Sequence, residues 1–352
     1  MKLLKMKHLL LLSIITSAVI SCSSPSGKEN SSNLKYFRQL LFSETPYDQF
    51  KGIYPLTAAE AKKINNYTFT YNPEGKLTGV AYMRGDELLA YGSKGYARVE
   101  ITYTDSTETH HYFNKNNESQ MSGGAFASVY RLDKNGNRIG LYFLDKAGNK
   151  IENRNKIAYY VWKVLPDGMI QEKRYNMKDE ETVMNANCPF YELRFSYDKN
   201  GYCVRLANYM ADTLYNCTEE NCGDIGVSYF LFDNNEKGAL KQFAVYNVTG
   251  QMSNLYSGWS KFINTLDENG YVTESIYFDQ DNEPLGGKTN PITVNKYDEH
   301  GAVIERQYLD KNRKLFVRPN IGAAVVKYKY DSKGNPADTT YLDAAMAEIV
   351  KK

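Results

Sequence analysis

Hydrophobic and polar residues alternate along much of the chain with a period of two. Residues 191–197 read Tyr-Glu-Leu-Arg-Phe-Ser-Tyr, and segments 98–103 and 325–330 repeat the pattern. Such alternation predicts β-strands with one buried face and one solvated face. The faces expected to be buried carry Tyr191, Leu193 and Phe195 in one segment and Val326, Tyr328 and Tyr330 in another. The Glu, Arg and Lys faces are expected to be solvated.

A tight-turn signature follows the alternating segments. It usually begins with Asp or Asn and ends with Gly, as in Asp133 to Gly136 and Asp267 to Gly270, and one unit has Pro166-Asp167-Gly168 instead. Asp suits the first position of a type I turn, and Gly suits the fourth, where a positive φ closes a hairpin with a bulge. The predicted turn glycines are Gly75, Gly136, Gly168, Gly201, Gly238, Gly270, Gly301 and Gly334.

The turn signature recurs at a nearly fixed period. From Gly136 onward the glycines lie 32, 33, 37, 32, 31 and 33 residues apart, which indicates a repeat architecture. A second strand follows each glycine, and a looser turn such as Asp145 to Gly148 follows that strand. The sequence therefore predicts an all-β fold, an elongated array of about nine antiparallel β-hairpin repeats over residues 67–343, with a C-terminal tail at 344–352.

Residues 33–66 depart from the repeat. Six apolar residues are spaced for one helix face: Leu34, Tyr36, Phe37, Leu40, Leu41 and Phe42. Thr57 to Glu60 is a capping-box pattern that opens a short helix through Ile64. Because terminal units of repeat arrays need atypical caps, we expect a small helical N-terminal cap over the first strand. A separate functional domain is the alternative, although 34 residues are few for an independent core.

The Tyr-Asp-x-x-Gly strings at Tyr197, Tyr297 and Tyr330 resemble the YD repeats of RHS-like proteins. The hairpin periodicity also resembles MORN-like bacterial surface repeats. The resemblance covers most of residues 67–343, but the period is longer than that of typical YD repeats, and the units are too few to enclose a toxin. The resemblance implies a β-repeat architecture and no toxin function.

The first 21 residues are typical of an export signal. They combine a basic start with an apolar run at residues 9–20, which is too short for a bilayer-spanning helix. The run ends in Val19-Ile20-Ser21-Cys22, which resembles a bacterial lipobox with Ile at a position where Ala or Ser is commoner. The resemblance implies a lipoprotein signal peptide at 1–21 and lipid attachment at Cys22. Ordinary signal cleavage, with Cys22 incidental, is the alternative.

Residues 22–32 are polar and low in complexity, as expected of a flexible tether. We therefore expect a lipid-anchored protein of the bacterial cell envelope. Ser23 after the cysteine, where Asp would mark retention, favours the outer membrane by analogy with known sorting rules.

The charge balance gives no sign of a nucleic-acid partner. Removal of residues 1–21 takes three Lys from the 43 basic residues and none of the 41 acidic ones, so the mature chain carries a net charge of about −1. Neither nucleic acid nor an anionic membrane surface is expected to bind such a chain through charge.

Four cysteines remain after Cys22: Cys188, Cys203, Cys217 and Cys222. An even count in an exported chain suggests disulfides. A Cys217–Cys222 loop is preferred, and a Cys188–Cys222 rung between successive units is the competing pairing. Zinc is less favoured, because no Cys-x-x-Cys pair or nearby His supports a site.

No established catalytic or metal motif is present. The sequence has no nucleophile elbow, phosphate loop, His-Glu-x-x-His or dinucleotide fingerprint. The acidic turns, of which residues 279–283 are the densest, invite a calcium interpretation, but turn chemistry explains a single Asp beside Lys more simply. His110 and His111 are adjacent in a predicted strand, so their rings point to opposite faces and cannot chelate together. We expect no catalytic residues, no metal and no cofactor.

Three functions fit these observations. The first is a non-enzymatic envelope lipoprotein whose repeat surface binds a protein partner. The second is a glycan-binding lipoprotein that uses exposed aromatics, with Trp162 and Trp259 as the first candidates. A hydrolase is the third, and it would need a pocket with converging carboxylates of perturbed pKa.

Overall fold

The computed structural model describes residues 33–48, 50–90, 92–184, 190–216, 227–255, 257–286 and 290–350. The chain divides into two units after Ser32, and every described residue belongs to the second unit. This unit is nearly all β, as predicted, with 23 strands in one antiparallel sheet among the described residues. The sheet is open, because β2 and β23 each pair on one side only. No helix in the described part is both long and apolar enough to cross a membrane.

Nine hairpins over the described ranges build the sheet, and the outgoing strand of each pairs with the first strand of the next. They are β3 (Asn65–Tyr71) with β4 (Leu77–Arg84), β6 (Arg98–Tyr103) with β7 (Thr107–Phe113), β8 (Ala127–Leu132) with β9 (Arg138–Leu144), β11 (Tyr159–Val164) with β12 (Ile170–Tyr175), β13 (Glu192–Tyr197) with β14 (Cys203–Met210), β16 (Tyr229–Asn234) with β17 (Leu240–Tyr246), β18 (Lys261–Leu266) with β19 (Val272–Phe278), β20 (Ile292–Tyr297) with β21 (Val303–Leu309), and β22 (Val325–Tyr330) with β23 (Pro336–Leu342). Short strands β5 (Glu87–Leu88), β10 (Lys150–Ile151) and β15 (Thr213–Leu214) fold back on β4, β9 and β14.

The predicted turn chemistry is confirmed. In the β8–β9 turn, Asp133 Oδ1 accepts hydrogen bonds from the backbone N–H groups of Asn135 and Asn137, each at 2.8 Å. Gly136 has φ +82°, and all eight predicted turn glycines have φ between +69° and +94°. A register shift beside the turn, between Arg131 and Leu132, marks the expected bulge. The side-chain oxygen thus satisfies the backbone donors that a sharp reversal leaves free.

In most of the looser second turns an Asp or Asn side-chain oxygen likewise accepts hydrogen bonds from backbone N–H groups of the turn. Asp279 Oδ1 accepts hydrogen bonds from the backbone N–H groups of Asp281 and Glu283, each at 3.0 Å, and a bridge between Phe278 and Pro284 begins a short return strand. Each unit is therefore a hairpin followed by a looser second turn, as the sequence predicted, and by a short return. Because the Asp279 carboxylate is occupied by its own turn, turn chemistry accounts for this acidic segment.

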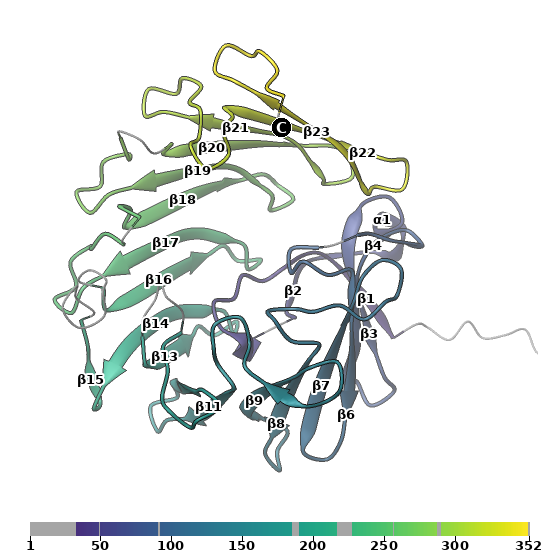
Figure 1. The fold of residues 1–352 in the computed structure, drawn as a ribbon, viewed down its shortest axis with the longest axis vertical. Coiled ribbons are helices and arrows are strands. Elements are labelled where there is room, and N and C mark those ends of the chain that lie inside the picture. Colours follow the sequence, from purple (N-terminus) through teal and green to yellow (C-terminus); the bar gives the residue numbers. More distant parts are fainter. Residues whose placement is uncertain are drawn as a thin grey trace, which may run out of the picture. The chain divides into compact units, whose positions relative to one another are not determined.

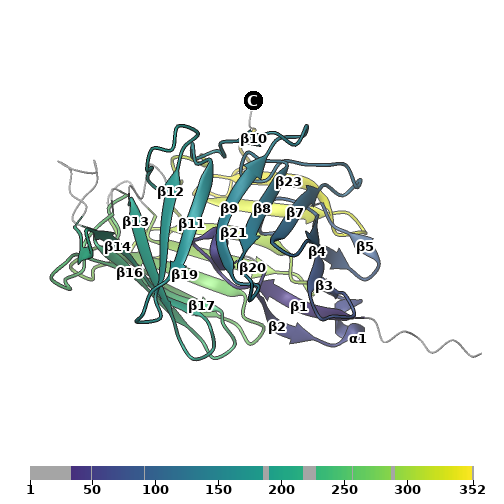
Figure 2. The ribbon, with the colours of Figure 1, turned by 90° about the horizontal axis from the view of Figure 1, so that it is seen from below.

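The predicted N-terminal helix over residues 34–42 is wrong. Leu34–Leu40 forms strand β1, which pairs with β3 on one side and with β2 (Gly52–Leu56) on the other (Figure 2). Strand β3 would otherwise expose a row of unpaired backbone groups, and a strand can satisfy that row where a helix cannot. The short capped helix is confirmed as α1 (Ala58–Ala61), where Thr57 and Glu60 form the capping box, although it ends before Ile64.

Between β1 and β2 the chain crosses the inner face of the sheet (Figure 1). We call residues 41–48 and 50–51 the inner segment; it contains the single-turn helix η1 (Pro46–Asp48). The Tyr47 ring contacts Trp162 at 5.2 Å and Phe195 at 5.6 Å between centroids. Tyr130 Oη donates a hydrogen bond to the Pro46 carbonyl at 2.9 Å. The inner segment therefore fills the space in front of β8, β11 and β13.

The turns of the later hairpins return to the N-terminal strands. The contacts are Lys51 Nζ donating to the Asn200 carbonyl (2.7 Å), Asn235 Nδ2 donating to Tyr54 Oη (2.7 Å), Arg38 Nη1 donating to Tyr271 Oη (3.5 Å), Asn65 N donating to the His300 carbonyl (2.8 Å) and Ala90 N donating to Asn335 Oδ1 (3.0 Å). Figure 1 shows the yellow turn between β22 and β23 beside α1 and β4. The sheet is thus open in its strand pairing, yet its last turns contact its first strands.

The burial predictions are confirmed only in part. Leu193 and Phe195 are buried, but Tyr191 is 42% exposed, because it precedes the first residue of β13. Glu192 and Arg194, on the face expected to be solvated, are buried by their mutual ion pair and by their neighbours. In β22, Val326 is buried and Tyr328 and Tyr330 are half-buried.

Candidate functional site

One position of the hairpin sorts the units into two classes. Six residues before the turn glycine, the chain places a side chain on the inner face of the sheet, the face that packs against the inner segment. This residue is aromatic in six units: Phe69, Tyr130, Trp162, Phe195, Phe232 and Tyr328. In two neighbouring units it is Asn264 and Asn295, which face Ser275 and Arg306 on the paired strands. At this position β18 and β20 are therefore polar where the six other units with a turn glycine are aromatic.

The aromatic units are packed. Trp162 is 3% exposed and Phe195 1% exposed, and they belong to the largest hydrophobic cluster together with Tyr130 and Leu206. The inner segment covers Trp162 and Phe195 through Tyr47. Trp162, Phe195 and Tyr130 are therefore packed within the core and not open to a ligand.

The two asparagine units leave an open hollow. A cavity of about 480 Å³ lies over the inner face of β18–β21 and is lined by Asn264, Ser275 and Asn295 among others. A second cavity, of about 430 Å³, is lined by Trp259 and Asn290. Tyr277, Thr293 and Arg318 line both cavities. We call the two together the inner groove.

One wall of the inner groove is aromatic. The half-buried Trp259 ring lies 5.4 Å from Phe243, 5.7 Å from Phe262 and 5.5 Å from Tyr277 between centroids. Such packed rings are held rigidly and lose little conformational entropy when a ligand binds against them.

The floor of the inner groove consists of two hydrogen-bonded pairs of side chains, Asn264 with Ser275 and Asn295 with Arg306. Asn264 Oδ1 accepts a hydrogen bond from Ser275 Oγ at 2.7 Å, and Asn264 Nδ2 donates to the Leu240 carbonyl at 3.0 Å. Asn295 Oδ1 accepts from Arg306 Nε at 2.9 Å. These bonds hold the polar groups in fixed positions, as a recognition site requires.

Two arginines also face the inner groove. Arg306 comes from β21, and Arg318 comes from the loop that follows it, where its guanidinium lies over the Tyr308 ring at 5.1 Å. Burial raises the pKa of the groove residue Tyr297 to about 12, although the charge of Arg306 opposes the shift. At neutral pH the Tyr297 hydroxyl is thus neutral, and it donates a hydrogen bond to the Val272 carbonyl at 3.0 Å, which leaves its oxygen as an acceptor.

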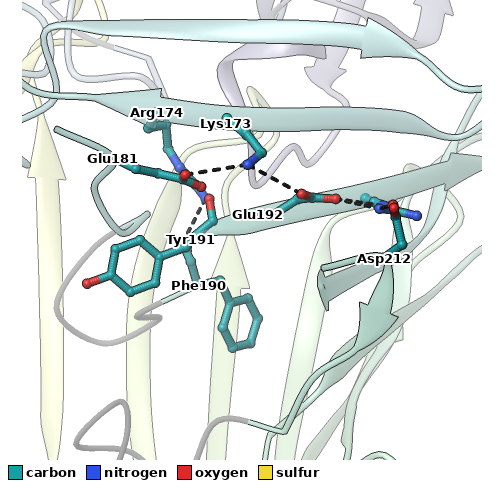
Figure 3. Close-up of polar contacts among 8 residues, drawn as sticks. Lys173, Arg174, Glu181, Phe190, Tyr191, Glu192 and Asp212 are labelled. Carbon is teal, nitrogen blue, oxygen red and sulfur yellow. Dashed lines mark hydrogen bonds and ion pairs between the residues drawn. The ribbon is translucent and has the colours of Figure 1, made fainter. Parts of the chain in front are cut away.

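A buried ion pair lies next to the aromatic core on β12. Glu172 accepts hydrogen bonds from Trp162 Nε1 at 2.8 Å and from Arg174 Nη1 at 3.2 Å. Arg174 Nη2 also donates to the carbonyls of Phe190 and Tyr191, each at 2.7 Å (Figure 3). On the other face, Figure 3 shows Lys173 between Glu181 and Glu192, at 3.4 and 3.7 Å. These charges are paired within the protein and join β12 to β13, although Arg174 Nε has no hydrogen-bond partner among the described residues.

A polar cavity of about 310 Å³ places Glu44 and Lys94 near Glu172. Burial raises the pKa of Glu44 and lowers that of Lys94, and each charge opposes the shift of the other. Both oxygens of Glu172 are already bonded to Trp162 and Arg174. The cavity therefore offers one unengaged carboxyl, whereas acid–base hydrolysis of the glycosidase type uses two.

A second buried charge cluster surrounds His110. Its Nε2 lies 2.5 Å from Glu108 Oε1, its Nδ1 has no hydrogen-bond partner in the described residues, and Glu108 also bonds Arg138. Burial lowers the pKa of His110 from 6.5, although Glu108 opposes the shift. Burial alone would raise the pKa of Glu108, but the hydrogen bond from His110 and the charge of Arg138 outweigh it and lower that pKa.

This arrangement predicts that acid destabilises the protein through His110. Because its folded-state pKa is depressed below 6.5, the unfolded chain binds a proton that the folded protein does not. Stability is therefore full above that value and is lost as pH falls toward the folded-state pKa. We expect the urea concentration at the unfolding midpoint to decrease as the pH is lowered from about 7 to about 5. This decrease should be smaller in a His110→Phe variant.

The matched control is His111→Gln, because His111 is exposed on the opposite face of β7. Its pH profile should follow that of the wild type. A His110→Phe profile as steep as that of the wild type would contradict the assignment.

The tryptophan and cysteine predictions have different outcomes. Trp162 is buried and cannot serve as an exposed platform, whereas Trp259 lines the inner groove. Burial, aided by Asp48, raises the pKa of the Cys203 thiol to about 12, and this thiol has no disulfide partner in the described ranges. Cys22, Cys188, Cys217 and Cys222 lie outside the described residues. Nowhere in the described chain do three His, Cys, Asp or Glu side chains gather as a metal site would require.

Comparison with known proteins is uninformative about function. No family model and no curated protein matches the chain. A porin-like protein from Bacteroides uniformis is similar over 78% of this chain and 95% of its own, at 10% identity and a TM-score of 0.31. TcdB2-TccC3-TEV and TcdB2-TccC3-Cdc42 match 79% and 90% of this chain at 12% identity, with TM-scores of 0.18 and 0.17. The match spans only 18% and 21% of those two chains, and the low TM-scores support no inference.

Apart from Trp259, the residues of the inner groove were not identified from the sequence. The signal was present, because aligning the units on their turn glycines shows Asn264 and Asn295 in a column that is otherwise aromatic.

Proposed function

We propose that this protein is a non-enzymatic lipoprotein of the cell envelope that binds a glycan in the inner groove. The observation that carries the proposal is the replacement of the inner aromatic by Asn264 and Asn295 in the two units that remain open. The membrane anchor at Cys22 is part of the proposal and is supported by the lipobox-like sequence.

The lining of the inner groove fits a sugar chain. A sugar ring has an apolar C–H face, which packs on aromatic rings, and hydroxyl edges, which need donors and acceptors. Trp259, Phe262 and Tyr277 provide the first kind of surface, and Asn264, Asn295 and Thr293 the second.

The size of the inner groove favours a glycan over a folded protein. Cavities of about 300–1,000 Å³ are typical of small-ligand sites, and a stable protein interface needs about 800 Å² from each partner. Both cavities of the inner groove lie in the first range. The protein partner expected from the sequence stays a prediction.

Affinity electrophoresis through gels that contain soluble polysaccharides tests the proposal. We expect at least one polysaccharide to retard the protein, and Trp259→Ala or Asn295→Phe to weaken the binding at least about tenfold, by removing the platform or filling the floor. Tyr159→Ala is the matched control, because Tyr159 stacks on Tyr175 away from the inner groove, at 5.0 Å. Equal retardation of all variants, or no retardation by any polysaccharide, would overturn the proposal.

A further inference from the structure

The inner groove has an unbalanced charge. Its described lining contains Arg306 and Arg318 and neither Asp nor Glu. The chain as a whole has nearly equal numbers of acidic and basic residues, 41 and 43, so a local excess of positive charge is not a consequence of composition.

Both arginines are held in the same way. Arg306 Nε donates to Asn295 Oδ1 at 2.9 Å, and Arg318 Nε donates to Asn320 Oδ1 at 3.0 Å. Neither guanidinium has an ion-pair partner within the described residues. A hydrogen bond from Nε to an asparagine side-chain oxygen fixes the plane of each guanidinium. It leaves the two terminal nitrogens able to donate to a ligand. Those nitrogens are the donors that bind a carboxylate, sulfate or phosphate through two parallel hydrogen bonds.

Two other arginines on the inner face are neutralised within the protein. Arg138 pairs with Glu108, and Arg174 pairs with Glu172. Arg84 has no ion-pair partner among the described residues, and its Nε donates to Asn65 Oδ1 at 2.8 Å, but it does not line the inner groove.

We infer that the inner groove selects an acidic glycan, whose anionic groups are bound by Arg306 and Arg318 while its sugar rings pack on Trp259 and Tyr277. This inference rests on the proposed function and adds the class of ligand. The acidic group is a carboxylate or a sulfate, since a guanidinium binds both in the same geometry.

The test compares probes that differ in charge. Polygalacturonate, alginate and hyaluronan carry carboxylates, dextran sulfate carries sulfates, and dextran, mannan and methyl-esterified polygalacturonate are neutral. We expect the wild-type protein to bind at least one acidic probe and to bind neutral ones at least about tenfold more weakly. The carboxylate and sulfate probes, measured side by side, identify which acidic group is preferred. The affinity for the acidic probe should fall as salt rises from about 0.01 M to about 1 M.

Variants then locate the charge contact. Arg306→Gln and Arg318→Gln should each weaken binding of the acidic probe at least about tenfold and reduce its salt dependence, and the double variant should remove most of it. Arg313→Gln is the matched control, because it removes the same charge from an exposed ion pair with Glu274. Circular dichroism of each variant shows whether the sheet is intact.

The outcomes separate this inference from the proposed function. Equal binding of neutral and acidic probes that still depends on Trp259 would overturn the acidic selectivity and leave the glycan site standing. Acidic binding that Arg313→Gln weakens as much as Arg306→Gln would also overturn the inference, since the contact would then be diffuse. Failure of every probe to bind would overturn both proposals.

Discussion

Replacing Arg174 with methionine is expected to lower the free energy of unfolding by about 3–5 kcal/mol, because it leaves a buried carboxylate without its partner. The side chains of Arg174 and Glu172 are 0% and 1% exposed. The change also removes the two hydrogen bonds that Arg174 donates to the carbonyls of Phe190 and Tyr191. Urea unfolding of the variant at neutral pH measures the loss.

Two further variants show whether burial is the cause. Arg313→Met breaks an ion pair whose arginine is 56% exposed, and it should cost at most about 1 kcal/mol. The double variant Glu172→Met with Arg174→Met should recover much of the lost stability, because no unpaired charge is left in the core. A double variant less stable than Arg174→Met would show that the charges themselves do not cause the loss.

Gly270→Ala is expected to destabilise the protein more than the same change at Gly136. The two glycines close turns of the same type, with φ +80° at Gly270 and +82° at Gly136. The backbone cost of placing Ala at a positive φ, about 1–2 kcal/mol, is therefore the same at both sites. A Cβ at Gly136 would meet no atom within 4 Å, whereas a Cβ at Gly270 would overlap the ring of Tyr54. Tyr54 is 7% exposed and accepts a hydrogen bond from Asn235, so it cannot easily move. Overlap of this kind adds about 1–3 kcal/mol.

Thermal and urea unfolding measure the loss of stability in each glycine variant. The difference between the two losses is the contribution of the contact between residue 270 and Tyr54 of β2. Replacing Tyr54 by Ala in the Gly270→Ala background should reduce the difference between the two sites. Equal losses of stability in the Gly136 and Gly270 variants would show that the later turns do not pack tightly against the N-terminal strands.

The repeat could be predicted from sequence because its turns and strands are specified by residues that are adjacent in the chain. A turn that needs Asp at its first position and Gly at its fourth is specified within four residues, and alternation specifies the strands beside it. The phase of the hairpins and the positive φ of their glycines followed from these signals alone.

The N-terminal strand could not be predicted in the same way. Residues 34–42 carry apolar side chains at spacings that satisfy a helix and partly satisfy a strand. The choice was made by the open edge of β3, which lies about thirty residues away and is invisible to a local pattern. Tertiary pairing outweighed the local preference.

The inner groove was hidden for a different reason. Asn264 and Asn295 are ordinary polar residues in strands, and their importance appears only when the aromatic residues at the same position in other units are known to be packed. Which units are covered depends on the path of the inner segment, and that path is set by contacts such as Tyr47 with Trp162.

The contacts between the last turns and the first strands limit how this protein can evolve. An open stack of repeats can gain or lose a unit at almost any point, because each unit contacts only its neighbours. Here an added hairpin would displace His300 from Asn65 and Asn335 from Ala90 and leave several polar groups without partners. Duplication of single units, the usual route by which repeat proteins lengthen, is therefore closed to this chain unless the N-terminal strands change at the same time.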